Sequence, residues 1–233
     1  MTTFTAWQRF RSLVQELGAI ASFLYLMDRA LRRISRGWGL HYYQFVAQPL
    51  SDQPRLAPTR GKAFTFLLLQ EAASVLEELN RPPAVIRDRF SQGAQCLVAT
   101  KNETLVGCIW FIRGAYAEDE VRADYLLPQD GSCVWDFDVF IAEPERLGFL
   151  FAKQWDVFDA LLRPQGIRHT VSRINAFNRR SIASHRSLGA QDCGQALFLH
   201  FGSLQCMVSS QRPFLAFGGR PKLHIGLKSM SGA

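Results

Sequence analysis

Hydrophobic positions follow two alternating periods along most of the chain. From Ala63 onward, short β-rich runs are separated by segments whose apolar residues recur every three to four positions. A strand repeats its side-chain direction every second residue and a helix about every 3.6, so the two periods indicate the two element types. The expected strands are 63–69, 133–141, 168–175 and a pair within 193–209; the expected helices are one or two within 71–90, then 147–162 and 179–188.

The segment 94–112 predicts a β-hairpin, because its polar tip from Lys101 to Thr104 joins two β-rich runs. The polar stretch 113–132 that follows predicts a loop or excursion. Strands that alternate with helices in a chain of 233 residues indicate a mixed α/β fold.

An N-terminal arm precedes this pattern. Residues 6–35 predict a helix, and its longest charge-free run, Leu17 to Met27, is too short to cross a bilayer, which needs about 20 residues. A strand at 41–47 and a Pro-rich connector at 49–58 follow. We therefore divide the chain into an arm, residues 1–58, and a main domain, residues 59–233. The apolar positions of the helix include Trp7, Phe10, Leu13, Val14, Leu17, Ala21, Leu24 and Leu31.

The net charge of +7 is concentrated in this arm. Residues 1–60 hold eight arginines and three acids, so the other 173 residues are close to neutral. The high isoelectric point is therefore no argument for specific nucleic-acid binding by the main domain. A basic helix with an apolar face predicts peripheral contact with a membrane through residues 6–35, or packing on the domain or on a second copy as a homodimer.

The cysteines and histidines predict neither a disulfide framework nor a metal site. Five cysteines are an odd number and contain no C-x-x-C, and the five histidines form no cluster with metal-ligand spacing. We expect a cytoplasmic protein. The basic arm raises the alternative of peripheral attachment to the inner membrane surface.

The predicted helix 179–188 has well-marked ends and a thin apolar face. Asn178 can cap its first turn, and Gly189 can take the left-handed conformation that ends it. Small residues such as Ser181 and Ser184 leave little bulk between these ends. The helix is either an ordinary surface helix or one that leaves room for a ligand.

The spacing of Asn178, Ser181, His185 and Leu188-Gly189 resembles the closing motif of the GNAT N-acetyltransferase superfamily. Two positions depart from the family's pattern: His185 stands where tyrosine is usual, and Ala190 where phenylalanine is usual. The order of elements from about 63 to 209 is similar as well. The resemblance implies a GNAT-like α/β fold, with a mixed, mostly antiparallel central sheet flanked by helices and an extra N-terminal helix.

The same resemblance implies that acetyl-CoA is the cosubstrate. Its pyrophosphate is expected at the start of helix 147–162, where amide groups and the helix dipole favour an anion. In this loop Arg146 and Gly148 match the family, whereas Phe149, Leu150 and Phe151 stand where glycine is frequent, so an ordinary strand-turn-helix is the alternative. The implied coenzyme-binding residues are Ala142, Arg146, Leu147, Gly148, Phe149, Leu150, Asn178 and Ser181.

Two carboxylates lie on the strand 133–141. Asp136 and Asp138 alternate with Trp135, Phe137 and Val139, which predicts that both acids face the same side. Acids on an apolar strand are costly unless they are solvated or partnered. The resemblance implies a general base here, Asp138 first and Asp136 second; the alternative is an ion pair with an arginine such as Arg173.

His185 is the third candidate catalytic residue. The resemblance implies that it protonates the departing coenzyme A thiolate, because imidazole exchanges a proton near neutral pH. The alternative is a hydrogen-bonded helix histidine with no part in catalysis.

These features together predict an acyltransferase that moves an acetyl or other acyl group from coenzyme A to an acceptor amine by direct attack. A backbone N–H near the end of strand 133–141 would hold the oxyanion. Two other classes stay open: a catalytically inactive GNAT-fold binding module, and a membrane-surface or nucleic-acid-binding adaptor. Among acceptors, an amino sugar, another small molecule and a protein amine are not distinguished by the sequence.

Overall fold

The computed structural model describes residue 11 and residues 14–227. The chain forms two compact units. The terminal unit comprises residues 1–47, 120–124 and 173–233, and the central unit comprises residues 48–119 and 125–172. These bounds do not coincide with the arm 1–58, because the strand β1 (Trp38–Pro49) pairs with β9 (Gln191–Phe201) near the other end of the chain.

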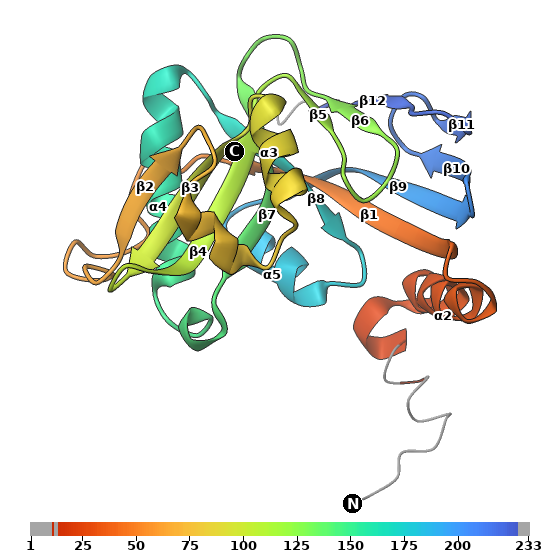
Figure 1. Ribbon diagram of the computed structural model, residues 1–233, viewed down its shortest axis with the longest axis horizontal. Helices are drawn as coiled ribbons and strands as arrows, with labels where there is room; N and C mark the ends of the chain where they lie inside the picture. The colour runs from red at the N-terminus through yellow and green to blue at the C-terminus, as the bar shows by residue number, and fades with distance from the viewer. Residues whose placement is uncertain (1–10, 12–13, 228–233) are drawn as a thin grey trace, which may run out of the picture. The chain divides into compact units, whose positions relative to one another are not determined.

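The central unit is built on strands in the order β2-β3-β4-β7-β8 (Figure 1). Their neighbours are antiparallel except for β7 and β8, which are parallel. The predicted strands and hairpin of this region are confirmed, and the mixed, mostly antiparallel sheet agrees with the expected fold class. The strands are β2 Thr65–Leu69, β3 Gln95–Lys101, β4 Thr104–Ile112, β7 Cys133–Ile141 and β8 His169–Asn175. Only the first four residues of β8 belong to the central unit.

Helical segments flank these strands. They are the 3-10 helices η1 (Ser74–Leu79), η2 (Glu143–Glu145) and η3 (Arg163–Gln165) and the α-helices α3 (Pro83–Ser91) and α4 (Leu150–Leu162). The predicted loop 113–132 contains two short strands, β5 (Ala115–Ala117) and β6 (Asp124–Leu126). Helix α4 starts at Leu150 and not at Leu147, because η2 forms a separate turn whose Glu145 carbonyl accepts from the Gly148 amide.

Helix α4 packs closely on β4. The rings of Phe158 and Phe111 meet edge-on at 5.0 Å, and the Gln154 side-chain amide donates to the Cys108 carbonyl at 3.0 Å. Gly107 permits this approach, since a Cβ there would collide with the Gln154 side-chain oxygen. The start of α4 is therefore fixed against the sheet, and the turn before it stays at the surface.

The terminal unit has strands in the order β11-β10-β9-β1 (Figure 1). Its remaining elements are β10 Leu204–Ser209, β11 Leu215–Phe217, β12 Lys222–His224, α2 Ala19–Ile34 and α5 Arg179–Ser187. A small core joins α5 to the sheet through Val46, Ile174, Ile182 and Ala190. The predicted strand 41–47, helix 179–188 and strand pair within 193–209 are thus confirmed.

The prediction of one continuous helix over residues 6–35 is wrong for the described residues. Gly18 has a φ of 83°, which an α-helix does not accommodate, and α2 begins after it at Ala19. The predicted apolar positions Trp7, Phe10 and Leu13 lie outside the described residues. No helix in the described part of the chain is long and apolar enough to span a bilayer.

Candidate active site

A β-bulge interrupts β7 at the two predicted acids. Cys108 of β4 faces Phe140 and Trp110 faces Phe137, so Asp138 and Val139 together oppose the single residue between them. Asp138 has a φ of 49°, in the left-handed region that residues with a Cβ rarely adopt. An extra residue in one strand breaks the alternation of side chains on the two faces.

The bulge separates the two carboxylates, so the prediction that both face the same side is wrong. The Arg89 guanidinium lies 5.1 Å from the Phe137 ring centroid and 2.7 Å from the Asp138 carboxylate, so Phe137 and Asp138 reach the same arginine. The Asp136 carboxyl is buried beside the hydroxyls of Thr170 and Ser172 on β8.

Asp138 is held in an ion-pair network. Its two oxygens accept from Arg81 at 2.6 Å and from Arg89 at 2.7 Å. Asp138 therefore forms an ion pair with arginine, which was the alternative to a role as base. The partner suggested from the sequence, Arg173, was wrong. Arg173 pairs instead with Glu120 at 3.0 Å in the terminal unit.

Arg89 is the centre of this network and was not found from the sequence. It is buried, it also pairs with Asp119 at 2.7 Å, and its guanidinium lies 5.1 Å from the Trp110 ring centroid. Burial lowers its pKa, but the charge of Asp138 and hydrogen bonds to both acids outweigh this and raise the pKa. One signal was present: Arg89 follows the buried Ile86 by three residues, on the inward face of α3.

Asp136 has the electrostatics of a general base. Burial raises the pKa of its carboxyl group to about 7, although the nearby hydroxyls of Thr170 and Ser172 offset part of the effect. A carboxyl group that titrates near neutral pH can accept a proton at that pH and release it again. Asp138, whose oxygens both bind guanidinium groups, is less suited to this role.

Asp136 also lies where β7 loses its neighbour. The parallel pairing of β7 with β8 runs from Cys133 and His169 to Trp135 and Val171, one residue before Asp136. Within the central unit, the pairing on this edge of β7 therefore does not extend to residues 136–141. An unpaired edge can hydrogen-bond a ligand that itself carries amide groups.

The turn between β7 and α4 contains most of the predicted coenzyme-binding residues. The Ala142 amide donates to the Val106 carbonyl at 2.7 Å, and Arg146 Nε donates to the Ile141 carbonyl at 3.2 Å. Leu150 is buried in the core beside Ala99 and Val106. Ala142 and Leu150 therefore contribute to the framework.

The rest of this turn is open to solvent. Leu147 is fully exposed, and Phe149 is partly exposed with the Arg60 guanidinium 4.8 Å from its ring centroid. A Cβ on Gly148 would meet no atom nearer than 3.4 Å, so the backbone there can be approached closely. The side chains at 147–149 can thus contact a ligand.

The first amides of α4 point out of the helix. Lys153 makes the first helical bond, to the Phe149 carbonyl at 2.9 Å, and no side chain caps this end. The amides of Leu150, Phe151 and Ala152 therefore have no acceptor within the helix, and the helix dipole adds partial positive charge there. Two acids, Glu143 and Glu145, precede this end of the helix. The charge of Glu145 is offset by Lys101, which pairs with it at 2.7 Å.

The other three predicted residues lie on or beside α5 in the terminal unit. The Asn178 side chain accepts from the Ser181 amide at 3.1 Å, which is the predicted N-cap. His185 is buried, and burial lowers its pKa to about 4. Its imidazole is uncharged at neutral pH, which does not favour the expected role of proton donor.

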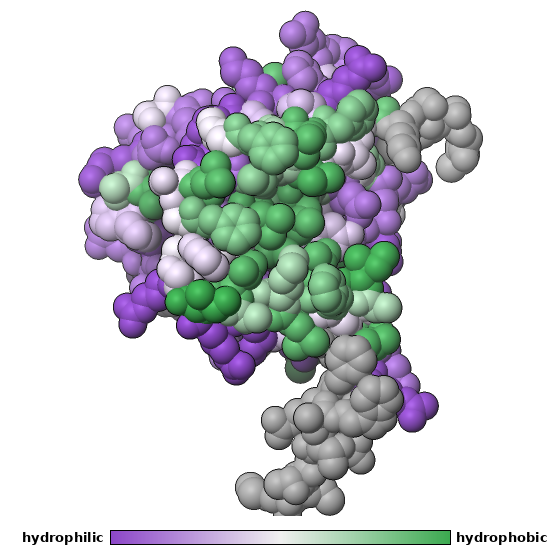
Figure 2. All heavy atoms as spheres, turned by 90° about the vertical axis from the view of Figure 1, so that its right-hand side faces the viewer, coloured by the Kyte–Doolittle hydropathy of each residue, from purple (hydrophilic) through white to green (hydrophobic). Residues whose placement is uncertain are grey.

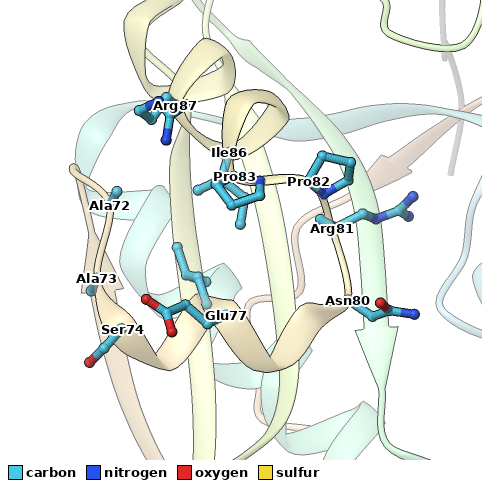
Figure 3. Close-up of a pocket in the computed structure, with 11 residues that line it drawn as sticks. Ala72, Ala73, Ser74, Glu77, Asn80, Arg81, Pro82, Pro83, Ile86 and Arg87 are labelled. Atoms are coloured by element: carbon cyan, nitrogen blue, oxygen red, sulfur yellow. The ribbon is translucent and has the colours of Figure 1, made fainter.

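A cleft of about 700 Å³ opens in the central unit between η1 and α3 (Figure 3). Glu77 of η1 and Arg87 of α3 lie on opposite sides of it. Arg81 lines the cleft and also pairs with Asp138, which connects this wall to the bulge in β7. Among the described residues no cluster of side chains could hold a metal ion.

Comparisons with known proteins agree with this architecture at the level of fold. No family model matches the chain, and no curated protein matches it. A conserved Staphylococcus epidermidis protein of unknown function is 10% identical over 87% of this chain and 82% of its own, with a TM-score of 0.51. A tandem GNAT protein from the clavulanic acid biosynthesis pathway is 13% identical over 66% of this chain, with a TM-score of 0.44.

A GCN5-related N-acetyltransferase from Sphaerobacter thermophilus is 18% identical over 77% of this chain and 55% of its own, with a TM-score of 0.38. The matched region spans half of the tandem GNAT protein. The likeness to the Staphylococcus epidermidis protein concerns the arrangement of elements, and the chemistry is argued from the residues.

Proposed function

We propose that this protein is an acyltransferase that moves an acetyl or other acyl group from coenzyme A to an acceptor amine. The observation that carries the proposal is the buried Asp136 carboxyl group, whose pKa is about 7, at the point where β7 loses its strand partner. The N-terminus of α4 and the cleft beside η1 belong to the same unit.

The residues of the turn fit coenzyme A. Its pyrophosphate is an anion, which the unpaired amides of Leu150, Phe151 and Ala152 attract. The exposed side chains of Leu147 and Phe149 offer apolar contacts to its adenine or pantetheine parts. The unpaired edge of β7 can bond the two amide groups of pantetheine.

Asp136 is the proposed base. When bound, acetyl-CoA supplies the acyl group as a thioester, which is reactive toward an amine. The Asp136 carboxylate takes a proton from the acceptor ammonium group, so that the nitrogen lone pair can attack the thioester carbonyl carbon. As the carbon–sulfur bond breaks, the acyl group remains on nitrogen and the thiolate takes up a proton.

The cleft between η1 and α3, which Arg81 connects to the bulge in β7, is the proposed binding place of the acceptor. The Glu77 carboxylate attracts an ammonium group, and the Arg87 guanidinium attracts an anionic group on the same molecule. We therefore expect an acceptor that carries both an amine and an acidic group.

Binding of the cosubstrate is tested by calorimetry with acetyl-CoA. Gly148→Trp should abolish binding without unfolding the protein, because the position is open to solvent. Gln53→Trp, also at an exposed position of the central unit, is the matched control and should bind as the wild type does. Wild-type affinity in Gly148→Trp would contradict this placement of the coenzyme.

Turnover is tested with acetyl-CoA and a panel of amines. Asp136→Asn should lower the rate about 100- to 10,000-fold and remove the rise in activity expected as pH passes through about 7. His185→Phe should change the rate less than twofold. If the protein binds the coenzyme but acetylates no amine, the inactive binding module is favoured. If Asp136→Asn keeps a rate within twofold of wild type, Asp136 is not the base.

A further inference from the structure

Helix α2 exposes its hydrophobic side. Ile20, Phe23 and Ile34 recur at helical spacing and have exposed fractions of 74%, 65% and 69%. Residues spaced by three, seven or fourteen positions share one side of a helix, so these three, with Met27, form one apolar stripe. A surface helix normally turns such a stripe toward the core, and α2 does the reverse.

The polar side of α2 contacts the rest of the terminal unit. The Asp28 carboxylate accepts from the Leu40 amide of β1 at 2.7 Å and pairs with Arg32 at 2.8 Å. On the same side, the Tyr25 ring meets Phe177 edge-on at 5.5 Å, and Ser22 is buried. These contacts fix α2 with its apolar stripe outward.

One face of the terminal sheet is apolar as well. Antiparallel residues that oppose each other lie on the same face, and the register pairs Leu204 with Phe201, Val208 with Leu197 and Phe217 with Cys206. Phe217 is 71% exposed. The face consists of Leu197, Leu199, Phe201, Leu204, Cys206, Val208, Leu215 and Phe217.

The stripe and the sheet face together form what we term the apolar surface. Figure 2 shows hydrophobic side chains gathered over the side of the molecule that holds α2 and β9 to β11, with hydrophilic side chains around them. A contiguous apolar area of this kind on a soluble domain marks contact with a membrane or another macromolecule.

The charge of the terminal unit distinguishes between these occupants. Its residues include 15 Lys and Arg against 5 Asp and Glu, a net charge of +10, whereas the central unit has 12 against 15, a net charge of −3. Two copies that met through this surface would bring two strongly basic units together. An anionic surface would instead be attracted to it.

We propose that the apolar surface lies on an anionic lipid bilayer. The side chains of α2 and of β9 to β11 enter the boundary between headgroups and acyl chains, while Arg33 and Arg36, both exposed, meet the lipid phosphates. The protein then rests on the membrane without crossing it. This attachment is independent of catalysis in the central unit.

The test is co-sedimentation of the full chain with vesicles. Vesicles of phosphatidylglycerol mixed equally with phosphatidylcholine should bind the wild type at least roughly tenfold better than phosphatidylcholine alone, and high salt should weaken binding. Phe23→Ser with Ile34→Ser should lower binding to anionic vesicles roughly tenfold, and Leu204→Ser with Phe217→Ser should do the same from the sheet.

Leu67→Ser is the matched control, because Leu67 is a 56% exposed leucine of the central unit, and it should bind as the wild type does. All the substitutions are at exposed positions, and circular dichroism checks that each variant is folded. Wild-type protein that stays in the supernatant with anionic vesicles would overturn the proposal. So would a stable dimer in light scattering without lipid that Phe23→Ser with Ile34→Ser converts to a monomer.

Discussion

The two units distribute apolar and charged side chains in opposite ways. Of the thirteen large hydrophobic side chains exposed among the described residues, ten belong to the terminal unit, and only Leu67, Leu147 and Phe149 belong to the central unit. Among the described residues, the buried acids and arginines follow the reverse order: Arg89, Glu118, Asp136 and Asp159 are all central, and the terminal unit buries one histidine, His185. Burying a charged group costs free energy, and so does exposing apolar area to water. The central unit bears the first cost and the terminal unit the second.

The two proposals above assign the two units different tasks. In the central unit, buried charges shift pKa values and hold side chains in fixed positions, which is what proton transfer requires. In the terminal unit, exposed apolar area and positive charge favour adhesion to a surface. Substitutions can test how much these groups change the free energy of unfolding. Those expected to have the largest effect lie in the central unit.

The largest effect on stability is expected from Arg89→Met. Removing the guanidinium leaves the Asp119 and Asp138 carboxylates without their buried partner, which should lower the free energy of unfolding by about 3–5 kcal/mol. Urea unfolding measures the change. Arg87→Met, at an exposed position of the same helix, should change it by no more than about 0.5 kcal/mol. Similar values for the two variants would contradict the network.

Asp136→Asn should change how stability depends on pH. In the folded state the Asp136 pKa is raised from 3.8 to about 7, so well below pH 3.8 both states are protonated and the group has no effect. As pH rises to 7, only the unfolded state ionises, which lowers wild-type stability by up to about 4 kcal/mol. Asp136→Asn should remove this decline. Unfolding free energies measured between pH 4 and 8 check it, and an unchanged slope would contradict burial of the carboxyl group.

A smaller effect is expected in the terminal unit from Asp28→Ala. The variant loses the hydrogen bond to the Leu40 amide and the ion pair with Arg32, which should cost about 2 kcal/mol and loosen α2. Hydrogen exchange of the α2 amides and thermal unfolding are the measurements. Glu16→Ala, also acidic but exposed, is the control. Unaltered exchange in Asp28→Ala would mean that other contacts orient the helix.

Local sequence determined most of the elements. The alternation in 133–141 and the polar tip at 101–104 depend on neighbouring residues, so β7 and the β3–β4 hairpin were found with close bounds. Asn178 was found as a helix cap for the same reason, since a cap bonds an amide only three residues away. The order of these elements was also enough to predict a mixed, mostly antiparallel sheet flanked by helices.

The sequence did not indicate the bulge at Asp138. The residues from Trp135 to Val139 alternate regularly and include no glycine, so nothing local marks an extra residue. The bulge appears only in the pairing of β7 with β4, where two residues of β7 oppose one of β4. The bulge turns the Asp138 carboxylate, and the guanidinium groups of Arg81 and Arg89 bind it there. The role of Asp138 therefore depended on two arginines that lie 57 and 49 residues away along the chain.

The orientation of α2 shows the same limit. By itself the sequence determined that this segment is helical and amphipathic, because the spacing of its apolar residues is a local property. Which side faces the protein was decided only by tertiary contacts, through Asp28 with the Leu40 amide and Tyr25 with Phe177. A hydrophobic period records that one side of an element avoids water, but the surface that covers this side is set by residues distant in the chain or by another molecule.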